Sequence, residues 1–208
     1  MKIEKLVQHW EPELPLLRCP KCGAEFTLES GQLRCRSGHC YDLSAKGYVN
    51  LAPNHDQKKE KYDAALFEAR SRIFADGFYR PVLDTVEGML ARRFGERSFT
   101  LADVGCGEGY YCAELARRFP SSAFFGVDLS RDGIQRAARN REACWMVADL
   151  KRLPFVPGGM DVVLDVLTPA DYQAFSSVLG ESGVLIKVIP GADYLKEVRN
   201  LFRDRLRN

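Results

Sequence analysis

The sequence has 208 residues, a formal net charge of +2 and 46% hydrophobic residues, which suits a small module joined to one α/β domain. Basic and acidic residues nearly balance, which excludes a uniformly basic nucleic-acid-binding protein, so any RNA surface must be a local patch. No apolar run reaches the roughly 18 residues of a membrane span, and the N-terminus lacks the apolar stretch of a signal peptide. We therefore expect a cytoplasmic protein with no membrane partner, whose seven cysteines are metal ligands or buried thiols rather than disulfides.

The first quarter of the chain predicts a small β module. Residues 1–17 are a lead-in with at most one short helix. Residues 18–52 contain short strands, including a hairpin that turns at Ser30-Gly31. About 35 residues bury too little apolar surface to fold alone, so this module needs a staple.

The remainder predicts a linker, two helices and an α/β domain. Residues 54–61 are polar and highly charged, as in a linker, and a helical pattern runs from 62 to 94 with a break at Asp76-Gly77. From residue 99, strands alternate with helices, which predicts a doubly wound, mostly parallel sheet with right-handed crossovers. The expected strands are 99–104, 123–127, 144–148, 161–167 and 183–189, and the expected helices are 109–119, 131–140, 170–178 and 191–206.

Two cysteine-containing segments of the first module have the spacing of a zinc site. CPKC forms a tight knuckle, and after 12 intervening residues CRSGHC offers three more ligands. This pattern favours one tetrahedral Zn²⁺ over a redox dithiol. His39 and Cys40 are neighbours whose side chains diverge, so only one of them completes the site. The turn before them favours His39, with Cys40 as the alternative. The expected ligands are Cys19, Cys22, Cys35 and His39.

Three carboxylates follow three successive strands and predict a nucleotide-like ligand. The turn DVGCGEG after the first strand has GxGxG spacing, with Gly105, Gly107 and Gly109. Asp103 beside this turn would repel a pyrophosphate and attract a cation such as S-adenosylmethionine. Asp128 after the second strand can accept from ribose hydroxyls, and Asp149 after the third can accept from the adenine amine. Together they favour a methyl donor over a dinucleotide or a bare scaffold.

The fourth expected strand, DVVLDVLTP, ends at the edge of the sheet where the transferred methyl group would lie. Asp165 and Thr168 are therefore candidates to touch the acceptor, and Asp165 is the candidate catalytic base. The alternative places Asp165 beyond the site, in a salt bridge. The remaining cysteines of this domain are expected to be buried thiols, namely Cys106, Cys112 and Cys144.

Four stretches in this order resemble the bacterial 23S ribosomal RNA guanine-N1 methyltransferases. They are CPKC…CRSGH, YDLSAKGYVNL, YDAALFEARSRIFADGFYRP and LADVGCGEGYY. The resemblance implies a class I, Rossmann-like methyltransferase fold behind a zinc module, acting on a guanine in a domain II hairpin. Some members of that family confer macrolide resistance. It also implies zinc ligands at Cys19, Cys22, Cys35 and His39, and donor contacts at Tyr79, Gly107, Glu108 and, more weakly, Tyr194.

The resemblance further implies that two C-terminal strands of the usual sheet are missing, because family members continue beyond position 208. Two alternatives stay open: the sequence is a piece of a longer protein, or it is a short member whose sheet edge is covered otherwise. In the second case catalysis is affected more than donor binding.

The sequence thus predicts a zinc-containing rRNA (guanine-N1-)methyltransferase in three parts: an RNA-recognition module (1–53), a linker and helical segment (54–96), and a donor-binding domain (97–208). Basic residues around the ligands would contact RNA, namely Arg18, Lys21, Arg34 and Arg36, extended by Lys46, Lys58 and Lys59. The alternatives are a methyltransferase of a small molecule or protein, and a non-catalytic RNA-binding protein. A homodimer stays open as the assembly.

Overall fold

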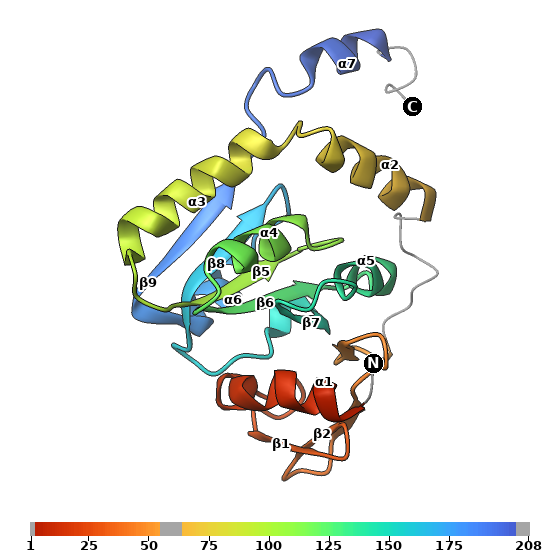
Figure 1. Cartoon of the computed structure of the whole chain (residues 1–208), viewed down its shortest axis with the longest axis vertical. Helices are drawn as coiled ribbons and strands as arrows, with labels where there is room; N and C mark the ends of the chain where they lie inside the picture. The colour runs from red at the N-terminus through yellow and green to blue at the C-terminus, as the bar shows by residue number, and fades with distance from the viewer. Residues whose placement is uncertain (1–2, 55–63, 203–208) are drawn as a thin grey trace.

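The structure is a computed structural model that describes residues 3–54 and 64–202 (Figure 1). It contains a three-stranded antiparallel sheet and a six-stranded sheet of order β4-β7-β6-β5-β8-β9, in which all paired strands are parallel. The strands are β1 (Phe26–Glu29), β2 (Gln32–Cys35), β3 (Cys40–Asp42), β4 (Tyr48–Asn50), β5 (Thr100–Val104), β6 (Ala123–Asp128), β7 (Cys144–Val147), β8 (Met160–Val166) and β9 (Leu179–Val188).

Helices flank both sheets. They are α1 (Ile3–Trp10), η1 (Glu11–Leu16), α2 (Ala64–Ala75), α3 (Arg80–Phe94), α4 (Tyr110–Arg118), α5 (Arg131–Ala137), η3 (Leu150–Arg152), α6 (Tyr172–Val178) and α7 (Lys196–Leu201). Within the described ranges, none is long and apolar enough to cross a membrane.

The large sheet has one strand more than the sequence pattern predicted. The five expected strands are present in the order β7-β6-β5-β8-β9, which confirms the parallel doubly wound class. The sixth, β4, pairs in parallel with β7 at the edge of the sheet, with Tyr48 opposite Trp145. A segment of three residues is too short to show the alternation of a strand, so the sequence pattern places residues 48–50 in the N-terminal module and not in the large sheet.

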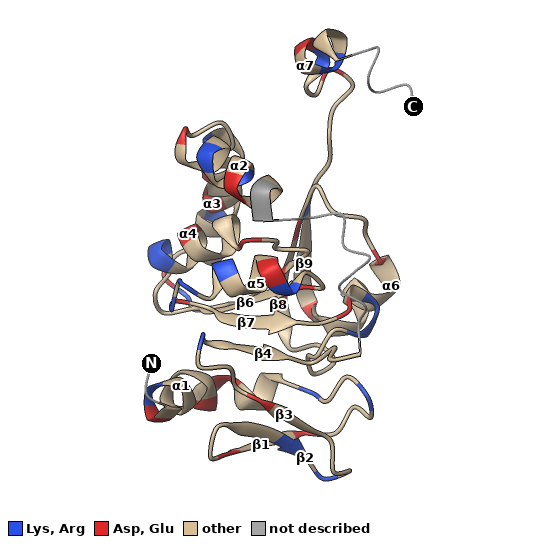
Figure 2. Cartoon of the chain, turned by 90° about the vertical axis from the view of Figure 1, so that its right-hand side faces the viewer, with Lys and Arg blue, Asp and Glu red and all other residues tan. Residues whose placement is uncertain are grey.

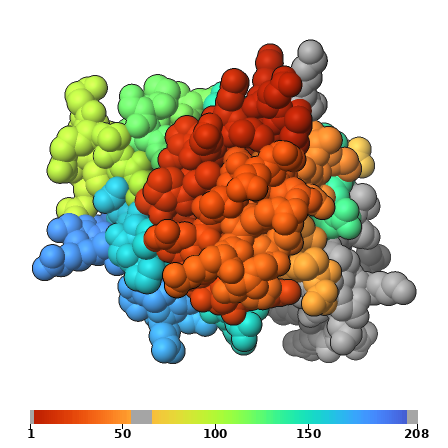
Figure 3. Space-filling view, turned by 90° about the horizontal axis from the view of Figure 1, so that it is seen from below, coloured from red at the N-terminus to blue at the C-terminus, as the bar shows by residue number. Residues whose placement is uncertain are grey.

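The N-terminal module covers one face of the large sheet. A single buried core joins Trp10 and Leu33 of the module to Phe125 and Met146 of the sheet, and α6 covers the same face. Seen from below, the module forms a continuous layer over the middle of the molecule (Figure 3). The module therefore completes its core on the sheet, in addition to any metal staple, which the sequence pattern did not indicate.

Helices α3, α4 and α5 cover the opposite face, in a second core. Trp145 lies at its centre, and its ring occupies the space above Gly126 on β6. A Cβ on Gly126 would lie 2.3 Å from this ring, so glycine is required for the close packing. The two packed faces hold the carboxyl ends of β5, β6, β7 and β8 in one row, where the predicted carboxylates Asp103, Asp128 and Asp149 lie.

Local sequence signals account for several turns. Ser30 and Gly31 have φ of 50° and 79°, which gives the two-residue hairpin predicted between β1 and β2. Pro81 lies in the first turn of α3, where its missing N–H costs no helical hydrogen bond. The lead-in contains α1 and η1, and most of the predicted linker lies outside the described residues.

Candidate functional site

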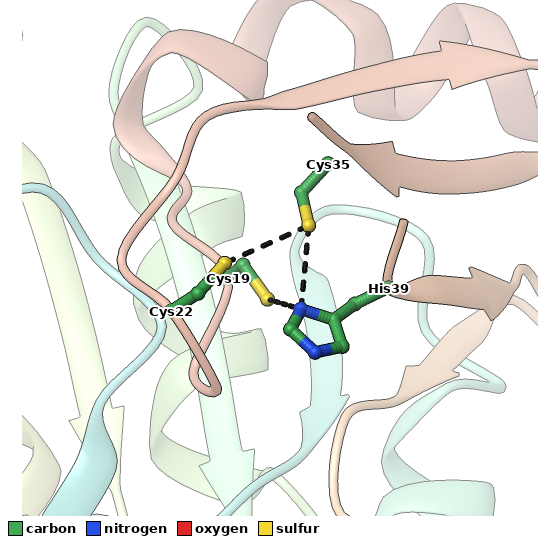
Figure 4. Close-up of side chains that lie close together, drawn as sticks. All are labelled: Cys19, Cys22, Cys35 and His39. Carbon is green, nitrogen blue, oxygen red and sulfur yellow. Dashed lines mark hydrogen bonds between the residues drawn. The ribbon is translucent and has the colours of Figure 1, made fainter. Parts of the chain in front are cut away.

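Four side chains of the N-terminal module converge on one point (Figure 4). The ligand atoms of Cys19, Cys22, Cys35 and His39 all lie within 4.8 Å of one another. The Sγ atoms of Cys22 and Cys35 are 3.7 Å apart, and His39 Nδ1 is 3.5 Å from the Sγ atoms of Cys19 and Cys35. Bond lengths of ~2.3 Å for Zn–S and ~2.0 Å for Zn–N give tetrahedral edges of roughly 3.8 Å between sulfurs and roughly 3.5 Å between sulfur and nitrogen, which match these distances. Three thiolates and one imidazole are therefore a complete zinc site.

The turn between β2 and β3 selects His39 over Cys40. Gly38 has φ of 82°, and the Cys35 N–H donates to the His39 carbonyl at 3.0 Å, which closes the turn with both ligands on one side. Cys40 begins β3 with an exposed side chain, while Tyr41 next to it is buried. Neighbouring residues on a strand point to opposite faces, so Cys40 points away from both the metal ligands and the core.

Four of the predicted donor residues line a cavity of about 510 Å³ at the carboxyl ends of β5, β6 and β8, beneath α2, namely Tyr79, Gly105, Gly107 and Asp128. Asp128 lines it, and its two oxygens accept from the backbone N–H groups of Gly107 and Ser130, each at 2.7 Å. Burial raises the pKa of Asp128, and these two hydrogen bonds and the charge of Arg70 oppose the rise. The carboxylate is thus held in place, with further lone pairs for two adjacent ligand hydroxyls.

The glycine-rich turn forms the floor of the cavity. Gly105, Gly107 and Gly109 all have positive φ, between 56° and 77°. A Cβ on Gly105 would lie 2.4 Å from the side chain of Thr168, whose hydroxyl donates to the Gly105 carbonyl at 3.3 Å. The loop after β8 therefore closes directly over the turn, and only a residue without a side chain leaves room for both.

Asp103 lies behind this turn and is 2% exposed. Its Oδ2 atom has no hydrogen-bond partner among the described residues. The pKa of Asp103 is raised to about 8, mainly by burial; a backbone hydrogen bond from Cys112 opposes this rise, and the charges of Asp128 and Asp165 contribute to it. A cationic ligand nearby would favour the ionised form, which agrees with the predicted attraction for a methyl donor.

Two predicted donor contacts meet each other, although 115 positions separate them. The hydroxyl oxygens of Tyr79 and Tyr194 are 2.6 Å apart, and Tyr79 lines the cavity. Burial and this hydrogen bond raise the pKa of Tyr194 to about 12. Glu108 accepts from the hydroxyl of Ser71 at 2.6 Å, which ties the glycine-rich turn to α2.

Asp149 lies in an adjoining hollow of about 400 Å³, which shares Leu129 with the main cavity. Its Oδ1 atom accepts from the Lys151 N–H at 3.0 Å and caps η3. The same hollow is lined by Lys21 of the zinc knuckle. The structure therefore brings Asp149 beside the predicted site and not into the same cavity as Asp128.

Asp165 is fully buried and forms the salt bridge that the sequence left as the alternative. Its Oδ2 atom is 2.7 Å from Lys187 Nζ, and its Oδ1 atom accepts from the Thr168 N–H at 3.3 Å. Lys187 Nζ also donates to the Thr168 carbonyl at 2.7 Å. Asp165 thus binds the N–H group of Thr168 and Lys187 binds its carbonyl group, which fixes Thr168 at the wall of the cavity.

Two charged residues of this site were missed from the sequence. Arg70 on α2 lines the cavity near Asp128, and Lys187 lies within β9. A lone lysine inside the apolar run VLIKV was the available signal for Lys187, because a charge within a parallel strand needs a partner. Arg70 gave no such signal, since it lies among other charges on a surface helix.

Family models match both parts of the chain. A model described as RlmA, N-terminal, a zinc ribbon, matches residues 17–61, and a methyltransferase-domain model matches residues 101–181. A putative 23S rRNA (guanine-N1)-methyltransferase of Bacillus subtilis is 39% identical over 195 residues, covering 90% of this chain and 68% of that protein. The chain belongs to the 23S rRNA (guanine-N1)-methyltransferase family. It is a methyltransferase with S-adenosylmethionine as its donor and zinc as the metal of its N-terminal ribbon.

Further relatives agree with this family. The 23S rRNA (guanine(748)-N1)-methyltransferase of Streptomyces fradiae is 30% identical, covering 88% of this chain and 66% of that protein. The chain thus spans about two thirds of the length of the family members it matches. Among solved structures, a putative S-adenosylmethionine-dependent methyltransferase of Methanococcus maripaludis aligns with a TM-score of 0.54 at 17% identity, covering 73% of this chain and 74% of that one. This likeness confirms the class I methyltransferase fold.

Proposed function

We propose that the chain transfers a methyl group from S-adenosylmethionine to N1 of a guanine in a 23S rRNA hairpin, in the cytoplasm. The observation that carries the proposal is one chain that joins a complete zinc ribbon to a donor cavity and is similar to rRNA methyltransferases across both parts. Relatives such as malonyl-[acyl-carrier protein] O-methyltransferases cover only about half of the chain, whereas the Bacillus subtilis relative covers 90% of it.

The residues present suit the donor. Asp128 would accept from the ribose hydroxyls, Asp103 lies where a cationic donor compensates its charge, and the glycine-rich turn leaves space for close approach. A donor that extends past Leu129 would place its adenine near Asp149. Tyr79 and Tyr194 would close the opposite side. When bound, the donor supplies an electrophilic methyl group. The protein supplies position and orientation.

Guanine N1 carries a proton that must leave before or during attack. Asp165 remains our candidate base, and in this structure Lys187 and the Thr168 N–H occupy its oxygens. As a base, Asp165 must open its bond to Lys187 when the acceptor is bound. Asp165→Asn should then lower kcat at least ~100-fold with little change in donor affinity. Full turnover of this variant would exclude Asp165 as the base.

The zinc ribbon is the proposed RNA-binding module. Arg34 and Arg36 are exposed at β2 and the adjoining turn, where Figure 2 shows basic positions at the lower end of the molecule. Lys58 and Lys59 lie outside the described residues. Replacing Arg34 and Arg36 by Gln should weaken RNA binding while donor affinity is unchanged. Unchanged RNA affinity would leave the ribbon with a structural role alone.

Methyl transfer from labelled donor separates the candidate functions. We expect label in unmodified 23S rRNA and none in protein or small-molecule extracts. Label in either extract instead of RNA would favour the other methyltransferase classes. Donor binding without transfer to any acceptor would favour a non-catalytic RNA-binding protein. The homodimer remains a prediction.

A further inference from the structure

A second hollow of about 510 Å³ lies apart from the donor cavity, between the turn before β4 and helix α5. The two share no lining residue. The residues at its rim carry four basic groups and one acidic group, namely Lys46, Arg136, Arg139 and Arg141 against Asp132. The chain as a whole has a net charge of only +2, so this hollow concentrates positive charge on a balanced surface.

Hydrogen bonds to uncharged oxygens hold two of the basic groups in place without neutralising them. Lys46 Nζ donates to the side-chain oxygen of Gln135 at 2.6 Å, and Arg141 donates to the Lys46 carbonyl at 2.7 Å. Gly47, with φ of 97°, lets the Arg141 guanidinium lie against the backbone. Among the described residues, Lys46, Arg139 and Arg141 form no ion pair, whereas Arg117 and Arg118 pair with glutamates nearby. Clustered cations without carboxylate partners are suited to an external anion.

A third hollow connects this basic site to the donor cavity. It lies between α2, α4 and α5, shares Arg136 and Arg139 with the basic hollow, and shares Phe74 with the donor cavity. Phe74 and Tyr110 both line it and stack with ring centroids 4.4 Å apart. Aromatic rings of this kind stack on unpaired RNA bases.

We propose that the basic hollow binds phosphates of the RNA strand that flanks the target guanine. The strand would run from Lys46, Arg139 and Arg141 past the Phe74–Tyr110 pair to the donor cavity, where the guanine is extruded. This inference rests on the proposed function and names a contact surface on the methyltransferase domain, separate from the zinc ribbon. Figure 2 shows basic positions on α5, on the side of the molecule where this strand would lie.

The test compares two double variants that remove the same charge. Lys46→Gln with Arg139→Gln alters the basic hollow and leaves Arg141 to hold the turn. Arg92→Gln with Arg97→Gln is the matched control at exposed sites outside it. The dissociation constant for an unmodified 23S rRNA transcript is measured at several salt concentrations, and donor affinity is measured separately.

We expect the hollow variant to bind RNA about 10-fold more weakly than the control, with a salt slope smaller by roughly 1.4, which is two contacts at ~0.7 each. Donor affinity should be unchanged in both. Equal RNA affinity and slope in the two variants would overturn the proposal. Methyl transfer to rRNA by the unaltered protein is recorded in the same preparations. Its absence rejects the proposed function, whereas equal variants with intact transfer reject only the basic hollow.

Discussion

At the scale of single residues, the zinc site gives the sharpest test of ligand choice. His39 Nδ1 lies with the three sulfurs, and Cys40 is exposed on β3. Cys40→Ser should therefore retain one zinc per chain, whereas His39→Ala should lower zinc affinity at least ~10-fold because it removes a ligand. Metal content after dialysis against a chelator measures both. Loss of zinc from Cys40→Ser would contradict the assignment.

Asp103 predicts a specific dependence of stability on pH. Its pKa is about 8 in the folded protein and near 3.8 when exposed, so between these values the folded chain holds a proton that the unfolded chain has lost. The free energy of unfolding should fall as pH rises towards 8, by up to ~1.4 kcal/mol per unit, and level off above it.

Urea unfolding between pH 6.5 and 8.5 measures this dependence, in a range where the zinc thiolates stay bound. Asp103→Asn should flatten the curve, and Asp193→Asn, at an exposed carboxyl, should not. An unaltered slope in Asp103→Asn would assign the pH dependence to other groups.

Residue-level prediction from sequence worked where spacing and chemistry coincide. The zinc ligands follow from two short segments, because a tetrahedral site constrains both spacing and atom type. The salt bridge of Asp165 could not be predicted in the same way. Its partner Lys187 is 22 positions away on the neighbouring strand, and their pairing depends on the register of the two strands. Its two interpretations could be separated only by knowing which strand lies beside β8.

At the scale of elements, the Tyr79–Tyr194 hydrogen bond joins the start of α3 to the segment before α7. If both tyrosines close over the donor, Tyr79→Phe and Tyr194→Phe should each lower donor affinity about 5-fold. The double variant should be little worse than either single variant, because each removes the same hydrogen bond. Isothermal titration with the demethylated donor measures the affinity of the unaltered protein, the two single variants and the double variant. Fully additive losses of binding free energy would show that the two hydroxyls act separately.

The shared core predicts that ribbon and sheet unfold together. Trp10 and Trp145 are the two tryptophans of the chain, both fully buried, one in each part. Trp145→Phe and Trp10→Phe leave a single reporter in the ribbon and in the sheet, respectively. Removal of zinc should lower the unfolding midpoint seen by both reporters, because one apolar core joins the two parts.

Thermal unfolding followed by fluorescence, with and without chelator, compares the reporters. Both should shift in parallel on chelation. A shift confined to the Trp10 reporter would mean that the ribbon unfolds independently of the sheet.

Element prediction succeeded for strands with long apolar runs and failed for β4. Residues 48–50 owe their strand to pairing with β7, which no local pattern encodes. For the same reason the sequence indicated only that the module needs a staple, and not that Leu33 and Trp10 pack against the sheet. Strand pairing between distant segments and packing between layers determine these two features, and the periodicity of apolar residues carries no information about either.

At the scale of the whole molecule, three surfaces converge on one edge of the large sheet. The zinc knuckle meets the hollow that holds Asp149, the donor cavity shares Leu129 with it, and the basic hollow reaches the cavity through Phe74. An RNA hairpin held by the ribbon and by α5 would therefore have its unpaired bases near the donor. On this proposal, the metal module precedes the methyltransferase domain because it would hold the RNA that the domain methylates.

The most direct test of this account is the identity of the methylated nucleoside. The protein, with zinc and S-adenosylmethionine, is incubated with unmodified 23S rRNA, and the RNA is digested to nucleosides for mass spectrometry. Asp128→Asn serves as the donor-binding control. We predict 1-methylguanosine at one site per RNA, and none with the control variant. Methylation at another atom or base, or equal methylation by Asp128→Asn, would contradict the account.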